Sequence, residues 1–99
     1  MENFRSPYLE MLTESREVLY MGYTLPLTSG EYEVLRVVLE SDGCIDKEEI
    51  RERTPSDVKM SQGSIPVHVN AINRKALAIG GRKIIGFKRK CGYFVEEKI

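Results

Sequence analysis

Apolar residues between positions 64 and 77, in the segment SIPVHVNAINRKAL, recur at the spacing of an amphipathic helix. Successive steps of four, three and four place them on one stripe of a 3.6-residue helix, which we expect to be buried. These stripe residues are Ile65, Val69, Ile72 and Ala76. The residues expected on the opposite face and its flanks are Val67, Asn70, Ala71, Asn73, Arg74 and Lys75. Because that face holds less charge than most solvated helix faces, we consider it a candidate binding surface.

Two earlier segments also carry the signals that start and end helices. Thr28 and Glu31 are spaced as a capping box ahead of an apolar stripe. Asp46 opens a second, short and heavily charged segment, which ends before Pro55. Ser64 is the expected N-cap of the third helix. We therefore predict helices at about residues 28–41, 46–54 and 64–79.

Short strand-like runs precede the first helix and follow the last. The N-terminal runs cover residues 8–12, 16–20 and 23–27, with TES and Met21-Gly22 between them as turns. Pro26 lacks a backbone N–H, so its strand should end there or lie at an edge. The C-terminal run, at about 83–96, is predicted to be a hairpin with Lys88, Arg89 and Lys90 at its tip.

The order of these elements is strands, helix, helix, loop, helix and hairpin. It predicts an α+β winged helix-turn-helix, with an N-terminal antiparallel sheet at about 8–27, a three-helix core and a C-terminal β-hairpin wing. With 99 residues, the chain can bury one modest core, so we expect one domain over 1–99. The core is predicted to contain Tyr32, Leu35, Val38, Ile50, Val69, Ile72 and Phe94.

The charges balance over the whole chain but separate along it. Residues 1–62 hold 7 Lys/Arg against 13 Asp/Glu, and residues 63–99 hold 8 against 2. The basic half contains the third predicted helix and the hairpin. Such an asymmetry favours a binding face for a polyanion, although chance clustering of surface charge can also produce it.

The inventory of reactive residues is small. Two cysteines, Cys44 and Cys91, and the single His68 cannot furnish a four-ligand zinc site, and disulfide frameworks normally carry more cysteines. We interpret both thiols as reduced and structural, with Cys91 as a buried small hydrophobe rather than a redox point. No paired nucleophile and base is visible, so we expect neither an enzyme nor a cofactor. No apolar run approaches the roughly 20 residues of a membrane span, so we expect a cytoplasmic protein.

Four separated stretches resemble the OmpR/PhoB-type DNA-binding output domain of bacterial response regulators. They are LPLTSGEYEVL (25–35), DGCIDKEEI (42–50), VHVNAINRK (67–75) and IIGFKRKCGYFV (84–95). The family pattern often has arginine where Ala71 and Asn73 stand, glycine where Lys90 stands, and a tryptophan that this chain lacks. The resemblance covers roughly residues 8–95.

The resemblance implies a four-stranded N-terminal sheet, whose fourth strand we expect from PYLEMLTE bending around Glu10. It also implies that the third helix lies in the major groove and the wing touches the minor groove. His68, Arg74 and Arg89 match family positions. Further implied partners are RNA polymerase, through the 54–63 loop, and a second copy arranged head to tail on direct repeats. The protein would be the output domain of a two-component response regulator or a stand-alone relative.

The residue chemistry supports the same function independently. Asn can pair with adenine, Arg with guanine, and small apolar groups with thymine methyls, while consecutive cations at a hairpin tip suit a narrow minor groove. The candidate DNA-binding residues are Val67, His68, Asn70, Ala71, Asn73, Arg74, Lys75, Lys88, Arg89 and Lys90. His68 is as well placed to bond a backbone carbonyl as a phosphate. The alternative function is a winged-helix protein-interaction module that has lost DNA readout.

Overall fold

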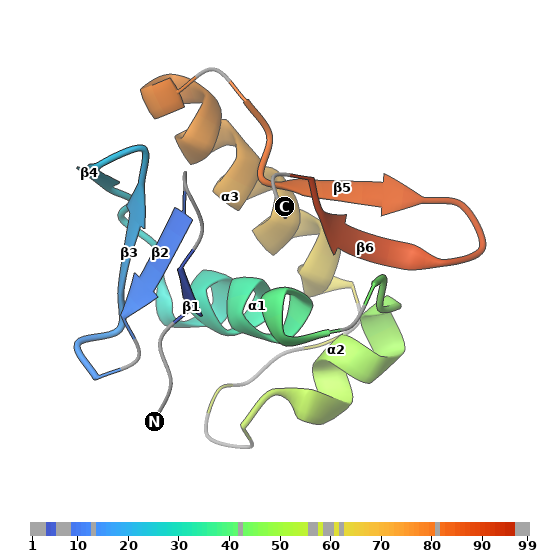
Figure 1. The fold of residues 1–99 in the computed structure, drawn as a ribbon. Helices are drawn as coiled ribbons and strands as arrows, with labels where there is room; N and C mark the ends of the chain where they lie inside the picture. The colour runs from blue at the N-terminus through green and yellow to red at the C-terminus, as the bar shows by residue number, and fades with distance from the viewer. Residues whose placement is uncertain are drawn as a thin grey trace.

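Strands and helices follow one another in the order β1 β2 β3 β4 α1 α2 α3 β5 β6 (Figure 1). The structure is a computed structural model, and it describes residues 4–5, 9–12, 14–41, 43–55, 58, 61, 63–80 and 82–96. In Figure 1 the N-terminal sheet lies on one side of the helices and the C-terminal hairpin on the other. This is the winged helix-turn-helix arrangement that the sequence predicts, in the α+β class.

The N-terminal sheet is antiparallel, with its four strands in sequence order. Its strands are β1 (Phe4–Arg5), β2 (Leu9–Leu12), β3 (Glu17–Tyr20) and β4 (Tyr23–Thr24). Met21 and Gly22 have φ of 53° and 85°, which is the geometry of a tight two-residue hairpin turn. The predicted origin of the fourth strand is wrong, because β1 supplies it and Glu10 lies within the continuous strand β2.

Most of helix α1 (Ser29–Glu40) is buried. Its capping box is confirmed, since Thr28 Oγ1 accepts from the Glu31 N–H and Glu31 Oε1 accepts from the Thr28 N–H. Eight of its residues are buried, and they include the acidic Glu31 and Glu33. The helix packs against α3, α2 and β6, so it forms the centre of the fold.

Helix α2 (Lys47–Arg53) is short and mostly solvated. The Asp46 carboxylate accepts from the Glu49 N–H at 2.9 Å, and Ile50 is the residue that the helix buries. On its surface, Arg53 forms an ion pair with Glu49, one helical turn earlier. Much of the 54–63 loop that follows, namely residues 56, 57, 59, 60 and 62, lies outside the described residues.

Helix α3 (Ser64–Gly80) lies across α1 with the predicted stripe turned inward. All four stripe residues are buried: Ile65, Val69, Ile72 and Ala76. Ser64 is not the N-cap, because it already belongs to the helix. Its N–H instead donates to the Ser61 side chain and backbone carbonyl.

The wing is the hairpin of β5 (Ile85–Lys88) and β6 (Gly92–Val95). Ile45, before α2, adds a bridge to Tyr93 through two backbone hydrogen bonds of 2.9 and 2.8 Å. Ile84, Ile85, Tyr93 and Val95 join the core, whereas Phe94 is only half-buried and was wrongly predicted there. Within the described part of the chain, none of the helices has the length and apolar character needed to cross a membrane.

Candidate nucleic-acid interface

The exposed side of α3 forms a continuous strip along the helix. Its members, at steps of three, four, three and one, are Val67, Asn70, Arg74, Leu77 and Ala78, and we call them the outer face of α3. Val67 is 63% and Leu77 46% exposed, which is high for aliphatic side chains. Arg74 is the one cation of this face. The outer face therefore offers apolar contact, one amide and one guanidinium.

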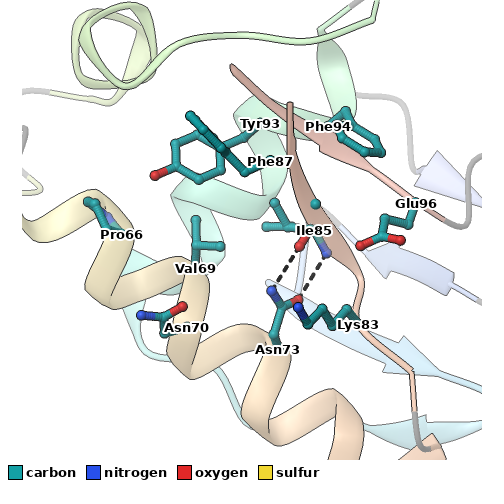
Figure 2. Close-up of a pocket in the computed structure, with 11 residues that line it drawn as sticks. Pro66, Val69, Asn70, Asn73, Lys83, Ile85, Phe87, Tyr93, Phe94 and Glu96 are labelled. Carbon is teal, nitrogen blue, oxygen red and sulfur yellow. Dashed lines mark hydrogen bonds between the residues drawn. The ribbon is translucent and has the colours of Figure 1, made fainter. Parts of the chain in front are cut away.

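Ala71 and Asn73 do not lie at the surface, so their predicted position beside that face is wrong. Ala71 is 8% exposed and Asn73 9%. The Asn73 amide NH₂ donates to the Ile85 carbonyl at 2.8 Å (Figure 2). Its Oδ1 accepts from the Ile84 N–H at 3.0 Å and the Ile85 N–H at 2.9 Å. Asn73 thus fixes the first strand of the wing to α3.

Lys75 also turns away from the outer face. Its Nζ donates to Glu31 Oε1 at 2.6 Å and to the Pro26 carbonyl at 2.7 Å. Burial alone would raise the pKa of Glu31, but the hydrogen bonds from Lys75 and the Thr28 N–H outweigh it and lower that pKa. Lys75 therefore links α3 to the capping box of α1.

His68 is half-buried and packs against the start of α1. A Cβ atom built on Gly30 would lie 2.8 Å from the His68 Cε1 and Nε2 atoms, so the ring approaches that backbone closely. Gly30 leaves the space that the imidazole occupies. Among the described residues, no group of three or more His, Cys, Asp and Glu side chains could hold a metal ion.

The turn of the wing presents three exposed cations, Lys88, Arg89 and Lys90. The Cys91 N–H donates to the Lys88 carbonyl at 3.1 Å and closes the turn. Lys90 has a φ of 69°, in the left-handed region that costs a side-chain-bearing residue roughly 1–2 kcal/mol. The turn therefore keeps a cation at a position whose backbone favours glycine.

A cleft of about 540 Å³ lies between α3 and the wing, with Asn70 of the outer face at its edge (Figure 2). Pro66, Val69, Asn70 and Asn73 line it from α3, while Ile85, Phe87, Tyr93 and Phe94 line it from the hairpin. Phe87 is 64% exposed, and its ring centroid lies 5.1 Å from that of Tyr93. Val67 lies on the outer face, as the sequence predicts, but the exposure of Phe87 was not predicted, because alternation alone does not show which side of a two-stranded hairpin is covered.

The structure corrects the interpretation of the cysteines. Cys44 and Cys91 are joined by a disulfide across 47 residues of sequence, and Cys91 is exposed. They are neither reduced nor buried as predicted. Sequence spacing could not reveal the pairing, because the bridge between Ile45 and Tyr93 brings the two segments together.

Solved structures share this fold. No family model matches the chain, and no curated protein matches it significantly. One similar structure, described as a novel family of redox sensors in the streptococci evolved from two-component response regulators, has a TM-score of 0.81 at 21% identity. The match covers 99% of this chain and 44% of that one, so the chain spans less than half of that protein.

Two further similar structures are DNA-binding domains solved with DNA. The response regulator AdeR domain, in complex with an intercistronic region, has a TM-score of 0.77 at 18% identity, covering 98% of this chain and 100% of that one. The Klebsiella pneumoniae RstA domain, in complex with the RstA box, has a TM-score of 0.75 at 16% identity, covering 99% and 100%. The chain therefore has the winged-helix fold of response-regulator DNA-binding domains.

Proposed function

We propose that this chain binds double-stranded DNA with sequence preference and acts in transcriptional regulation. The observation that carries the proposal is the pairing of two exposed surfaces: the outer face of α3, and the three-cation turn of the wing beyond the intervening cleft. A major groove about 12 Å wide admits an α-helix. The wing can reach phosphates or the minor groove beside it.

The outer face has the chemistry of base recognition. Asn70 can pair with adenine, Arg74 with guanine, and Val67 can contact a thymine methyl group. Lys88, Arg89 and Lys90 supply attraction that does not depend on sequence. Ala71, Asn73 and Lys75 contribute indirectly, because their side chains are committed to holding α3 against the rest of the fold.

A salt titration on a selected DNA site tests this proposal. The logarithm of affinity should fall with the logarithm of salt concentration, with a slope of about −0.9 per neutralised phosphate. Replacing Lys88, Arg89 and Lys90 together by Gln should make this slope shallower, by up to about the amount that three neutralised phosphates contribute. The matched control is Arg51→Gln, which removes an exposed cation from α2. A flat response in the parent protein contradicts the proposal.

A protein-interaction module is the second candidate. The observation favouring it is the exposure of three large apolar side chains, Val67, Leu77 and Phe87. Selection from a randomised DNA pool separates the two functions. If no sequence is enriched and binding to bulk DNA is negligible at low salt, the apolar surface is better explained by a protein partner.

The proposal extends to how the protein works in the cell. We place it in the cytoplasm, as the output domain of a two-component response regulator or as a stand-alone relative. Two copies would bind direct repeats head to tail, with the 54–63 loop toward RNA polymerase. Binding to DNA with one and with two half-sites tests the pairing, since cooperative copies should bind the double site more tightly per half-site.

A further inference from the structure

Cys44 and Cys91 place a disulfide at the edge of the cationic turn. Their Cα atoms lie 5.8 Å apart, within the range of about 4.4–6.8 Å that a disulfide spans without backbone movement. Cys44 directly precedes the bridge residue Ile45, and Cys91 directly follows Lys90. The cross-link therefore ties the turn of the hairpin to the segment that leads into α2.

The two segments are also held together by the backbone. Ile45 directly follows Cys44, and it exchanges two hydrogen bonds with Tyr93, which lies two residues after Cys91. Gly92 has a φ of 128°, and a Cβ atom there would lie 2.3 Å from the Ile45 carbonyl oxygen, so only glycine allows this approach. Reduced thiols would remain neighbours, which makes their re-oxidation an intramolecular reaction with a high effective concentration.

The pair is open to reagents from solution. Cys91 is exposed, whereas Cys44 is half-buried, so an incoming small thiol or disulfide reaches Cys91 first. A cleft of about 410 Å³ opens beside it, lined by Asp46, Lys47 and Lys90 together with Phe87 and Tyr93. The two lysines outnumber the one carboxylate of this lining, so the cleft favours an anionic reagent.

We propose that Cys44 and Cys91 are a reversible redox-modification site whose reagent is an anionic low-molecular-weight disulfide. The Cys91 thiolate attacks one sulfur of that disulfide, forms a mixed disulfide and releases the first thiol. The Cys44 thiolate then attacks the Cys91 sulfur, forms the Cys44–Cys91 bond and releases the second thiol. The two cysteines lose two electrons and two protons. The external disulfide takes up these electrons and protons and becomes two thiols.

The modification sets the freedom of the wing turn. In the oxidised state the covalent bond limits the movement of Arg89 and Lys90 relative to the start of α2. In the reduced state the β5–β6 pairing, the backbone hydrogen bonds at Ile45 and the turn bond from Cys91 still restrain them, but the covalent restraint is gone. The consequence for DNA rests on the proposed function: a turn that is already ordered loses less conformational entropy on binding, so the oxidised form binds more tightly.

The first experiment needs no DNA. The 99-residue chain is equilibrated in buffers of reduced and oxidised glutathione, quenched with acid, alkylated and weighed by mass spectrometry. We expect a reversible change between a monomer with two alkylated thiols and a monomer with none. Cys44→Ser should instead retain glutathione on Cys91. A disulfide between two chains, or one that excess glutathione cannot reduce, overturns the proposal.

The second experiment measures the wing in each state. Amide hydrogen exchange at residues 88–92 should quicken on reduction, and the Cys44→Ser/Cys91→Ser variant should match the reduced form in every buffer. DNA affinity should be about 3- to 10-fold higher for the oxidised protein, with no redox difference in that variant. Unchanged exchange overturns the proposed control of the wing. If exchange responds but neither state binds DNA, the DNA-binding function fails and the redox site stands.

Discussion

Asn70 and Asn73 are the same amino acid one helical turn apart, yet they belong to different parts of the molecule. Asn70 is exposed on the outer face of α3, at the rim of the cleft. Asn73 is buried, and all three of its hydrogen bonds go to the backbone at the start of β5. The cations Arg74 and Lys75 divide in the same way, since Arg74 is exposed and Lys75 is held by Glu31.

This difference separates residues that can meet a partner from residues that set the geometry of the interface. Asn73 fixes the wing to α3, and Lys75 fixes α3 to α1. A change at either position would alter the proposed DNA binding without any contact to DNA. The two faces of α3 therefore need to be compared by stability and by binding together, because binding alone cannot separate them.

The largest effect is expected from the buried stripe of α3. Ile72 has no exposed surface, so Ile72→Ala should lower the free energy of unfolding by about 2–5 kcal/mol through lost burial and the cavity left behind. Val67→Ala, on the outer face, should change it by less than about 0.5 kcal/mol. Chemical denaturation measures both. Similar losses for the two variants would show that the faces of α3 are not distinct.

The paired asparagines should give the next largest effect. Asn73→Ala leaves the buried N–H groups of Ile84 and Ile85 without their acceptor, so we expect a loss of about 2–4 kcal/mol in unfolding free energy. Asn70→Ala should cost less than about 0.5 kcal/mol. Asn73→Asp is a useful second variant, because it keeps the acceptor and loses the donor to the Ile85 carbonyl. Equal stability of the two alanine variants would contradict the assigned role of Asn73.

The elements of the fold could largely be predicted because their signals are local. The capping box at Thr28 and Glu31, the turn at Met21 and Gly22, and the apolar stripe of α3 each follow from residues close in sequence. Strand β1 could not be predicted, because its two residues are too few to show the alternation of a strand. Phe94 was misplaced because the helices cover only one side of the hairpin.

The site was harder to predict because it depends on contacts between distant segments. An asparagine or lysine on the flank of a helix is ordinarily solvated, and only the positions of Ile85 and Glu31 make Asn73 and Lys75 structural. Nothing near Cys44 in sequence indicates Cys91 as its partner. Lys90 stands where the resembled family usually has glycine, and its positive φ gives that departure a physical cost.

Arg74 on the outer face of α3 and Lys88 at the turn of the wing extend the comparison to DNA. If Arg74 contacts a base, Arg74→Ala should cost about 1–3 kcal/mol of binding and relax the preference at one position. Lys88→Gln should weaken all sequences nearly alike and lower the salt slope by about 1. Both effects can be measured by selecting preferred DNA sequences from a randomised site with each variant and with the parent protein. An unchanged motif with uniformly weaker binding would make Arg74 a phosphate contact.

The smallest effect is expected from protonation of Glu31, on the inner side of α3. Because the Lys75 and Thr28 hydrogen bonds lower the pKa of Glu31 in the folded protein, the unfolded chain binds its proton at higher pH than the folded one does. The resulting stabilisation is complete above the ordinary value of 4.5 and is lost as the pH falls through the lowered folded value. It is small because burial opposes the hydrogen bonds. Denaturation from neutral to acid pH should therefore show a larger loss for the parent than for Glu31→Gln. The control is Arg74→Gln, which changes a residue next to Lys75 but on the outer face, so its stability should depend on pH as that of the parent does. If Arg74→Gln instead loses less stability in acid, as Glu31→Gln should, the two faces are not distinct.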